Sequence, residues 1–265
     1  MKILIVSGFL GAGKTTFIKR LARNVDQRFA ILENEYGAAG IDGARLGQNR
    51  QGTQKNVWEM TEQCICCIGK KDFAASVLTI ANVVDPEYLI VEPTGVGSLA
   101  RIIENLRQIE YERIQLLSPV TIVDVYSYRR YMAEYPELYQ DQIRSADTII
   151  VSKTEACQAE EKQRIQKFLQ EINPQAKIIT DYASTMTRED YQSLLLGGRY
   201  EKEVQDTQSG EKMPETFSFE NIRMEAPETL WCFLEQIIRG AFGNIIRAKG
   251  QFAAGDQFLQ FDVAD

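Results

Sequence analysis

Short apolar runs alternate with amphipathic stretches from the N-terminus to about residue 195. Each run has the length and the β-branched content of a buried strand. The runs are KILIVSG, FAILENE, EYLIVEP, PVTIVDV, DTIIVSK and AKIIT, and the helical patterns between them include TTFIKRLARNV, LARIIENLRQI and AEEKQRIQKFLQEI. The alternation predicts an α/β fold with a mostly parallel central sheet flanked by helices, in which ligands bind at the carboxyl ends of the strands.

The pattern changes after residue 196. Residues 197–215 are polar and rich in charge, which is typical of a linker. Beyond them, FSFENIRM predicts a strand, APETLWCFLEQIIRGAF an amphipathic helix, and NIIRAKGQFAAGDQFLQFDVA a hairpin that turns near AAGDQ. We therefore expect a large domain over residues 1–196 and a small C-terminal α+β domain over residues 216–265, which is marginal alone and docks on the first.

A glycine-rich turn follows the first predicted strand. Gly8, Gly13, Lys14 and Thr15 fit the pattern G-x-x-x-x-G-K-[ST] between a strand and a helix. Glycines let successive backbone N–H groups face phosphate oxygens, the helix N-terminus adds a favourable dipole, and Lys14 supplies a point charge for the β and γ phosphates. The hydroxyl of Thr15 is expected to bind Mg²⁺. The turn predicts a P-loop NTPase fold.

Such proteins also need an acidic residue at the end of a neighbouring strand, to hold the metal ion. EYLIVEPTGVG offers Glu92, followed by Gly95, whose backbone N–H is placed to meet the γ-phosphate. Asp124 is the other candidate, although a carboxylate there more often caps the next helix. Lys14 and Glu92 are the predicted catalytic residues, and we expect slow intrinsic turnover because the sequence identifies no arginine finger.

The predicted base-binding segment is TIIVSKTE, which ends in Ser152, Lys153 and Glu155, where guanine-specific GTPases usually carry Asn-Lys-x-Asp. Glu155 keeps a carboxylate for the N1–H and N2 groups of guanine, on a longer stem. Lys153 can pack its aliphatic stem over the base. GTP is therefore the predicted nucleotide, with ATP or loose specificity left open.

A cluster of cysteines, CICC, contributes Cys64, Cys66 and Cys67, whereas the chain contains no histidine. Thiolates suit Zn²⁺, Cu⁺ or Co²⁺ better than Mg²⁺ or Ca²⁺. Three sulfurs leave a tetrahedral site one ligand short, for water, a carboxylate or a partner to complete. The nearby carboxylates are Glu33, Glu35 and Glu62. Two alternatives are a redox pair and buried cysteines that act as small hydrophobic residues.

The formal net charge of −7 gives no basic footprint, which argues against nucleic acid and anionic membranes as partners. No run approaches the roughly 20 apolar residues that a bilayer requires. The N-terminal apolar run reaches glycine and lysine too early for a signal peptide. We expect a cytoplasmic protein.

In order along the chain, the motifs GFLGAGKTTF, ENEYGAAGID, CICC, VEPTG, the degenerate base motif and RAKG resemble those of the CobW-like P-loop GTPases, relatives of UreG and HypB. The family resemblance implies a GTP-hydrolysing metallochaperone or insertase for zinc or cobalt, including corrinoid pathways. It implies that phosphate is bound by Gly8, Gly11, Ala12, Gly13, Lys14, Thr15 and Thr16, that Mg²⁺ is bound by Thr15 and Asp42, and that the transition metal is bound by Cys64, Cys66 and Cys67, with Glu33 as a further ligand. The departures are Gln63 where glycine is usual, Ser152 and Glu155 in the base motif, and a short tail without a histidine-rich stretch.

The segment from Glu33 to Cys67 connects the predicted phosphate site to the thiolates. Contacts with the γ-phosphate that order this segment would set the geometry of the sulfurs, so that GTP and GDP states differ in metal affinity or in their grip on a client. The expected cofactors are GTP or GDP, Mg²⁺, and Zn²⁺ with Co²⁺ as the alternative. The expected partner is a client metalloprotein, with corrinoid-dependent enzymes among the candidates, and dimerisation controlled by nucleotide or metal is a further expectation. The rival hypotheses are a P-loop kinase of a small metabolite, and a thiolate metal buffer or redox sensor with a vestigial P-loop.

Overall fold

The structure is a computed structural model of the 265-residue chain. It describes residues 1–27, 29–35, 57–63, 70–204, 217, 219, 223–224, 226–254 and 257–264.

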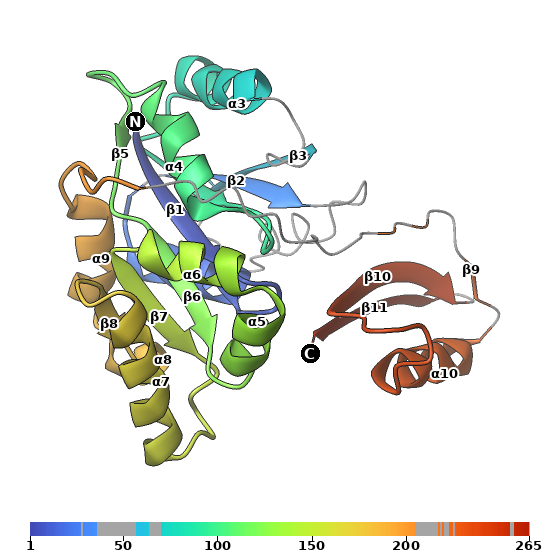
Figure 1. Cartoon of the computed structure of the whole chain (residues 1–265). Coiled ribbons are helices and arrows are strands. Elements are labelled where there is room, and N and C mark those ends of the chain that lie inside the picture. The colour runs from blue at the N-terminus through green and yellow to red at the C-terminus, as the bar shows by residue number, and fades with distance from the viewer. Residues whose placement is uncertain are drawn as a thin grey trace.

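An eight-stranded sheet forms the centre of the larger part of the molecule, in the strand order β3-β2-β4-β1-β6-β7-β8, with β5 paired to β1 (Figure 1). Its strands are β1 (Lys2–Gly8), β2 (Phe29–Glu35), β3 (Val57–Gln63), β4 (Tyr88–Glu92), β5 (Gln115–Leu116), β6 (Val120–Asp124), β7 (Thr148–Ser152) and β8 (Lys177–Ile179). Every pairing described in this sheet is parallel. The predicted α/β class is confirmed, and the six predicted strands of this sheet are present, whereas β3 and β5 were not predicted.

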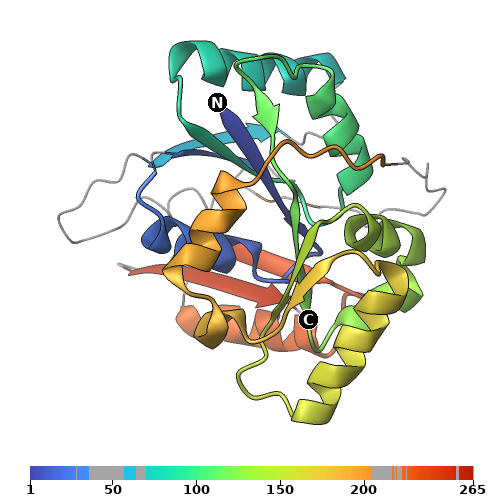
Figure 2. The same ribbon diagram turned by 90° about the vertical axis from the view of Figure 1, so that its left-hand side faces the viewer.

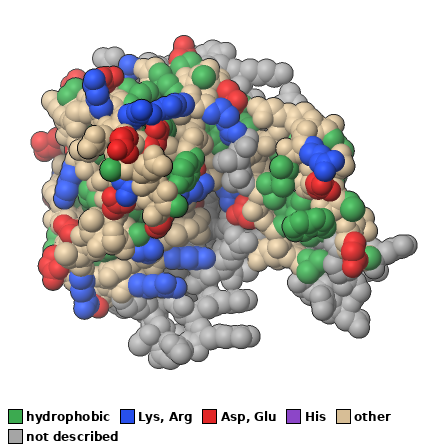
Figure 3. All heavy atoms as spheres, turned by 90° about the horizontal axis from the view of Figure 1, so that it is seen from below, with side chains coloured by type: hydrophobic (Ala, Val, Ile, Leu, Met, Phe, Trp, Pro, Cys, Tyr) green, Lys and Arg blue, Asp and Glu red, His purple; other side chains and the backbone are tan. Residues whose placement is uncertain are grey.

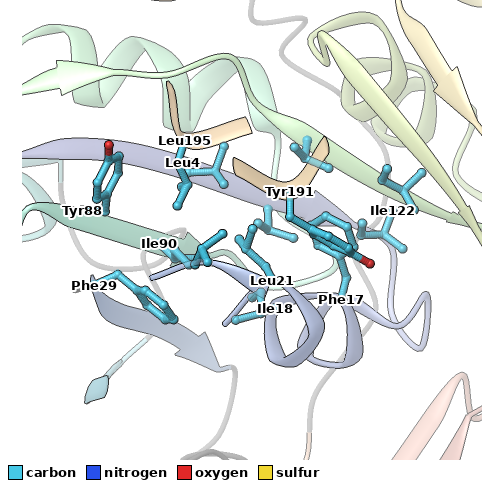
Figure 4. Close-up of a cluster of buried hydrophobic side chains, with 14 of the residues drawn as sticks. Leu4, Phe17, Ile18, Leu21, Phe29, Tyr88, Ile90, Ile122, Tyr191 and Leu195 are labelled. Atoms are coloured by element: carbon cyan, nitrogen blue, oxygen red, sulfur yellow. The ribbon is translucent and has the colours of Figure 1, made fainter. Parts of the chain in front are cut away.

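Helices cover both faces of the sheet. They are α1 (Lys14–Asn24), α3 (Lys70–Val83), α4 (Leu99–Arg107), α5 (Tyr128–Glu134), α6 (Pro136–Arg144), α7 (Ala159–Ile172), α8 (Tyr182–Thr185) and α9 (Arg188–Leu196). Successive side chains of β1 point to opposite faces. Ile3 and Ile5 therefore pack with α3 and α4, while Leu4 packs with α1 and α9 on the other face (Figure 4). No helix within the described ranges combines the length and apolar character needed to cross a bilayer.

The C-terminal unit, which we define as residues 223–264, contains a second sheet in the order β11-β10-β9. Its elements are β9 (Arg223–Met224), α10 (Pro227–Ile238), β10 (Arg247–Ala254) and β11 (Gln257–Ala264). The predicted helix and hairpin are both present, and the hairpin register pairs Ala254 with Gln257. Of the predicted strand over 217–224, the structure describes only β9 as a strand.

The core of the C-terminal unit is small. Leu230 of α10 packs with Leu234, Leu259 and Phe261. A Cβ on Gly250 would lie 2.6 Å from the Phe261 ring, so glycine at this position of β10 leaves room for that ring. The next residue of α10 after Leu230, Trp231, is 74% exposed. Figure 3 shows hydrophobic side chains gathered on this smaller part of the molecule.

The segment after α9 still packs on the larger part, although it opens the predicted linker. Tyr200 is buried in the cluster that contains Ile3 and Leu116. Its backbone N–H donates to the Leu116 carbonyl at 2.9 Å, and its hydroxyl donates to the Ser145 carbonyl at 2.8 Å. The division at residue 196 stays a prediction, and the described residues 197–204 run along the larger part.

Replacing Tyr200 with phenylalanine should lower the free energy of unfolding by about 1 kcal/mol at neutral pH, because the Ser145 carbonyl loses its donor. Burial, together with the negative charge of Asp147, raises the pKa of Tyr200 from 10.0 to about 12. Because this pKa is higher in the folded chain than in the unfolded chain, the contribution of the phenol to the free energy of unfolding is fully present below pH 10. It decreases as the pH rises toward 12. The difference between wild type and Tyr200→Phe should therefore narrow above pH 10.

Urea unfolding at pH 8 and at pH 11 measures this difference directly. A gap that stays constant between these two pH values would show that the Tyr200 phenol does not titrate differently in the folded and unfolded chain.

Candidate functional site

The turn between β1 and α1 depends on glycine at its two ends. Gly8 has φ +140°, and a Cβ there would lie 2.4 Å from the Ile122 carbonyl oxygen of the neighbouring strand β6. Gly13, which precedes α1, has φ +96°. Both values lie in a region that residues with a side chain rarely adopt. The backbone can therefore curl tightly here, and its N–H groups approach the N-terminus of α1.

Lys14 is folded back over this turn. Its Nζ donates to the carbonyl oxygens of Gly8 at 3.0 Å and Phe9 at 3.3 Å, and the residue is only 6% exposed. A nearly buried ammonium beside a helix N-terminus makes the turn strongly attractive to an anion. The geometry is that of a phosphate cradle.

Glu92 is the last residue of β4, which lies beside β1 in the sheet. The hydroxyl of Thr15, in the first turn of α1, donates to its two carboxylate oxygens at 3.0 and 3.3 Å. Hard oxygen donors that converge in this way are the ligands that Mg²⁺ prefers. The two side chains therefore fit a Mg²⁺ site at the edge of the phosphate cradle.

The loop after β4 is clamped against the phosphate turn. A Cβ on Gly95 would lie 2.5 Å from the Leu10 backbone nitrogen, so the two loops touch through their backbones. From the other side, the buried Gln142 of α6 donates through Nε2 to the carbonyls of Gly95 and Gly97, each at 3.0 Å. Asp141 accepts the Leu99 N–H at 2.7 Å and so caps α4.

Ser152, at the end of β7, connects the predicted base-binding segment to the phosphate turn by a hydrogen bond. It is 3% exposed, and its hydroxyl donates to the Ala12 carbonyl at 2.6 Å and to the Val123 carbonyl at 3.3 Å. The hydroxyl thus fastens the predicted base-binding segment to the phosphate turn.

Lys153 follows with φ +59°, and its Nζ forms an ion pair with Asp124 Oδ2 at 2.6 Å. The other oxygen of Asp124 accepts the Tyr126 N–H at 2.9 Å. Asp124 therefore orders a turn and holds Lys153, and a metal-binding role for it stays a prediction. Glu155 is exposed to solvent.

A pocket of about 370 Å³ joins these features, a volume within the range of small-molecule sites. Its lining residues are Gly11, Gly13, Lys14, Thr15, Thr16, Lys19, Glu92, Lys153, Arg247 and Asp262. Most of them come from the phosphate turn and α1, and the last two come from the C-terminal unit.

A comparison with protein families finds a match over residues 2–180 to the model described as "CobW/HypB/UreG, nucleotide-binding domain". The chain belongs to this family.

Other members of the CobW/HypB/UreG family resemble this chain in sequence and in fold. The "Zinc chaperone YeiR" of Escherichia coli is 30% identical over 178 residues, which cover 66% of this chain and 53% of that protein. The "Zinc chaperone CobW" of Pseudomonas aeruginosa is 27% identical over 194 residues, 62% of this chain and 52% of that protein. The chain spans about half the length of these curated relatives. The crystal structure of Zn(II)-bound YjiA GTPase from E. coli matches with a TM-score of 0.56 at 19% identity, covering 100% of this chain and 86% of that one.

Several predicted site residues of this CobW/HypB/UreG chain cannot be compared with the structure. Those that lie outside the described residues are Asp42, Cys64, Cys66 and Cys67, together with the side chain of Glu33. Within the described part of the chain, no group of three His, Cys, Asp or Glu side chains is arranged to hold an ion. The assignment of the transition metal to the cysteines stays a prediction.

The backbone nevertheless places β3, the strand that directly precedes the cysteines. Glu33 of β2 pairs with Glu92 of β4, and Glu35 pairs with Gln63, the last residue of β3. Cys64 therefore follows directly on the carboxyl end of β3. In a parallel sheet, that end lies at the same edge as the ends of β4 and β1.

The remaining predicted residues either line one pocket or are absent from its lining. Those on the lining are Gly11, Gly13, Lys14, Thr15, Thr16, Glu92 and Lys153, and those absent from it include Gly8, Ala12, Gly95 and Glu155. Ser152 lies behind the phosphate turn and not on the lining. The sequence analysis did not identify Gln142 and Asp141. The only signal for them was a pair of polar residues in a helix that must pack against the sheet. The sequence analysis also gave no role to Arg247.

Proposed function

We propose that this chain is a GTP-hydrolysing metallochaperone that binds Zn²⁺ at Cys64, Cys66 and Cys67 and couples its nucleotide state to delivery of the metal to a client protein. One observation carries the proposal. β3, which leads into Cys64, ends at the same edge of the sheet as β4, which ends in Glu92 beside Thr15.

Hydrolysis is supported by the geometry around the phosphate turn. Lys14 and the backbone N–H groups of the turn can stabilise charge on the transferring phosphoryl group. Thr15 and Glu92 would hold Mg²⁺, which when bound supplies charge neutralisation at the β and γ oxygens. Glu92 also stands where a carboxylate can orient a water molecule. The loop at Gly95 is held by Gln142 and touches the backbone of the phosphate turn at Leu10.

The choice of GTP rests on the family and on one side chain. YjiA, whose fold this chain shares, is named a GTPase. Glu155 has a solvent-exposed carboxylate, which is a group that can accept the N1–H and N2 amine of guanine. Lys153 is held by Asp124 with its stem on the pocket lining. ATP remains the alternative substrate in the assay below.

Zn²⁺ is supported by the soft thiolate set and by the names of the relatives, which are called zinc chaperones. An incomplete set of protein ligands suits an ion that must be passed on. Co²⁺ binding, the client and dimerisation stay predictions.

The spacing of strands supports coupling between the two sites. β3 and β4 are separated by β2 alone, so that their carboxyl ends lie about 10 Å apart across the sheet. β2 contains Glu33, which pairs with Glu92, and ends two residues later, while β3 ends at Gln63, directly before Cys64 in the sequence. We therefore expect a backbone movement caused by the γ-phosphate to change the positions of the sulfurs.

The test is the affinity for Zn²⁺, measured by chelator competition with a non-hydrolysable GTP analogue or with GDP bound. We expect the two affinities to differ by about tenfold, within the usual range of coupling between two sites. By linkage, Zn²⁺ must change the analogue affinity by the same factor. Equal Zn²⁺ affinities in the two states would refute the coupling.

The control variants use the cysteines. The triple substitution Cys64→Ser, Cys66→Ser and Cys67→Ser should abolish tight Zn²⁺ binding, whereas Cys232→Ser, at an exposed cysteine of α10, should leave it unchanged. Phosphate release from GTP and ATP without any acceptor, measured alongside, distinguishes a GTPase from a metabolite kinase.

A further inference from the structure

The pocket at the phosphate turn is closed on one side by the C-terminal hairpin. Arg247, the first residue of β10, and Asp262 of β11 line it together with Lys14, Thr15 and Glu92. The hairpin lies toward the sheet edge at which β1 ends, below α1 in the second view (Figure 1, Figure 2). The sequence placed more than 230 residues between Lys14 and Arg247, and the fold brings both to one cavity.

The position of Arg247 is fixed by its neighbour. Ile246 is 7% exposed and belongs to the hydrophobic cluster that contains Phe9 and Tyr131. Phe9 directly follows Gly8, and its ring centroid lies 4.1 Å from that of Tyr131. The residue that precedes the hairpin is therefore packed into the cluster that contains Phe9 of the phosphate turn, and the hairpin begins at the next residue, Arg247.

The orientation of Arg247 is set by a carboxylate. Its Nε donates to Asp262 Oδ1 at 3.1 Å, and its Nη2 donates to Oδ2 at 3.0 Å. The two residues lie diagonally across the hairpin, since Asp262 is paired with Lys249 and Arg247 with Ala264. A guanidinium can bind a carboxylate along one edge and a phosphate oxygen along another. The two hydrogen bonds to Asp262 thus fix the orientation of the Arg247 guanidinium.

The charges of the pocket favour an anion with several negative charges. Its lining contains the cationic side chains of Lys14, Lys19, Lys153 and Arg247 and the acidic side chains of Glu92 and Asp262. Positive potential in a walled pocket attracts and retains polyphosphate. Among these lining cations, Arg247 is the one that comes from the C-terminal unit.

We propose that Arg247 is a phosphate-binding residue, which the C-terminal hairpin supplies to the nucleotide site of the same chain, and that Asp262 is its positioning residue. The proposal rests on the proposed nucleotide hydrolysis. Arg247 lines the same pocket as Thr15 and Glu92, which would hold Mg²⁺ at the β and γ oxygens, and we therefore assign its contact to the terminal phosphate. The C-terminal unit therefore senses whether that phosphate is present.

The test compares Arg247→Ala with wild type in binding and in turnover. Loss of a charge-assisted contact should weaken the affinity for a non-hydrolysable GTP analogue about tenfold or more. The affinity for GDP should change less than about twofold, because the terminal phosphate is missing. The value of kcat should fall by about 10- to 100-fold, since a guanidinium at the transferring phosphoryl group stabilises the transition state.

Three further variants control the result. Arg239→Ala removes an exposed arginine of the same unit, which pairs with Glu235 in α10, and should match wild type in every measurement. Arg247→Lys keeps a cation without the fork and should fall between wild type and Arg247→Ala. Asp262→Asn should also lie between them, because it leaves Arg247 in place but weakens its orientation.

Hydrogen exchange of the β10 amides provides a readout that does not depend on turnover. Binding of the GTP analogue should slow this exchange in wild type and in Arg239→Ala, but not in Arg247→Ala. If Arg247→Ala unfolds the hairpin, seen as fast exchange without nucleotide, the Arg247→Lys variant replaces it in the comparison.

Two outcomes would overturn the inference. One is an Arg247→Ala or Arg247→Lys variant that binds the analogue and hydrolyses GTP as wild type does. The other is an equal loss of affinity for the analogue and for GDP. A wild-type protein that hydrolyses no nucleotide would instead contradict the proposed function, so the two failures are distinguishable.

Discussion

Replacing Lys14 with alanine is expected to abolish measurable GTP hydrolysis while the chain remains folded. Its ammonium is nearly buried at the mouth of the phosphate turn and bonded to the Gly8 and Phe9 carbonyls. No other described lysine donates to that turn, and removal of one preorganised donor to a transferring group commonly lowers kcat by about 10²- to 10³-fold. Phosphate release with saturating Mg²⁺ and GTP measures the loss.

The fold should tolerate this change because Lys14 lies outside the apolar clusters that hold α1 on the sheet. Those clusters use Phe17, Ile18 and Leu21 on the inner side of the helix. Circular dichroism and the urea midpoint of Lys14→Ala should therefore stay close to wild type. The matched control is Lys167→Ala, which removes an exposed positive charge from α7, outside the pocket lining, and should leave kcat unchanged. Retained turnover in Lys14→Ala would place the nucleotide site elsewhere.

Most of the site residues that could be predicted from the sequence lie in one contiguous motif. The turn from Gly8 to Thr15 could be recognised from its glycine spacing, from the apolar run before it and from the helix pattern after it, which all lie within about twenty residues. Glu92 could be predicted because the carboxyl ends of parallel strands share one edge of the sheet. The Thr15–Glu92 contact is the geometry that this argument requires.

The contacts that the sequence did not predict join residues that are far apart along the chain. Gln142 bonds to Gly95 across 47 positions, and Ser152 bonds to Ala12 across 140. A hydroxyl at the end of a strand is equally suited to a base or to a neighbouring carbonyl, and only packing decides between them. The role of Arg247 likewise depends on how the hairpin docks, which Ile246 determines through a cluster far from it in sequence.

Strand β3 and the helices α5 and α6 were missed for a different reason. VWEMTEQ mixes charged with apolar residues, as is typical of an edge strand exposed on one side. The two helices are 7 and 9 residues long, too short for their periodicity to stand out against the surrounding loops.

Replacing Gly95 with alanine should impair hydrolysis nearly as strongly as the loss of Lys14, although no charged group is removed. The added methyl would lie 2.5 Å from the Leu10 nitrogen and 2.9 Å from its Cα, and both atoms belong to the backbone of the phosphate turn. The loop cannot retreat freely, because Gln142 holds the Gly95 carbonyl from α6. A displacement of roughly 1 Å at a reacting phosphate can lower the rate about 10²-fold.

Overpacking of this kind also destabilises a fold, typically by about 1–3 kcal/mol, so that stability and positioning must be separated. Gly198→Ala is the matched control, since a Cβ at Gly198 meets nothing within 4 Å and should leave both properties unchanged. The kcat and the affinity for the GTP analogue are compared at a temperature where urea unfolding shows every variant to be fully folded. If Gly95→Ala then hydrolyses GTP at the rate of Gly198→Ala, the two loops move independently and their backbone contact does not position the phosphate. If its rate is lower in the fully folded state, the close approach of Gly95 to Leu10 is a requirement of the nucleotide site itself.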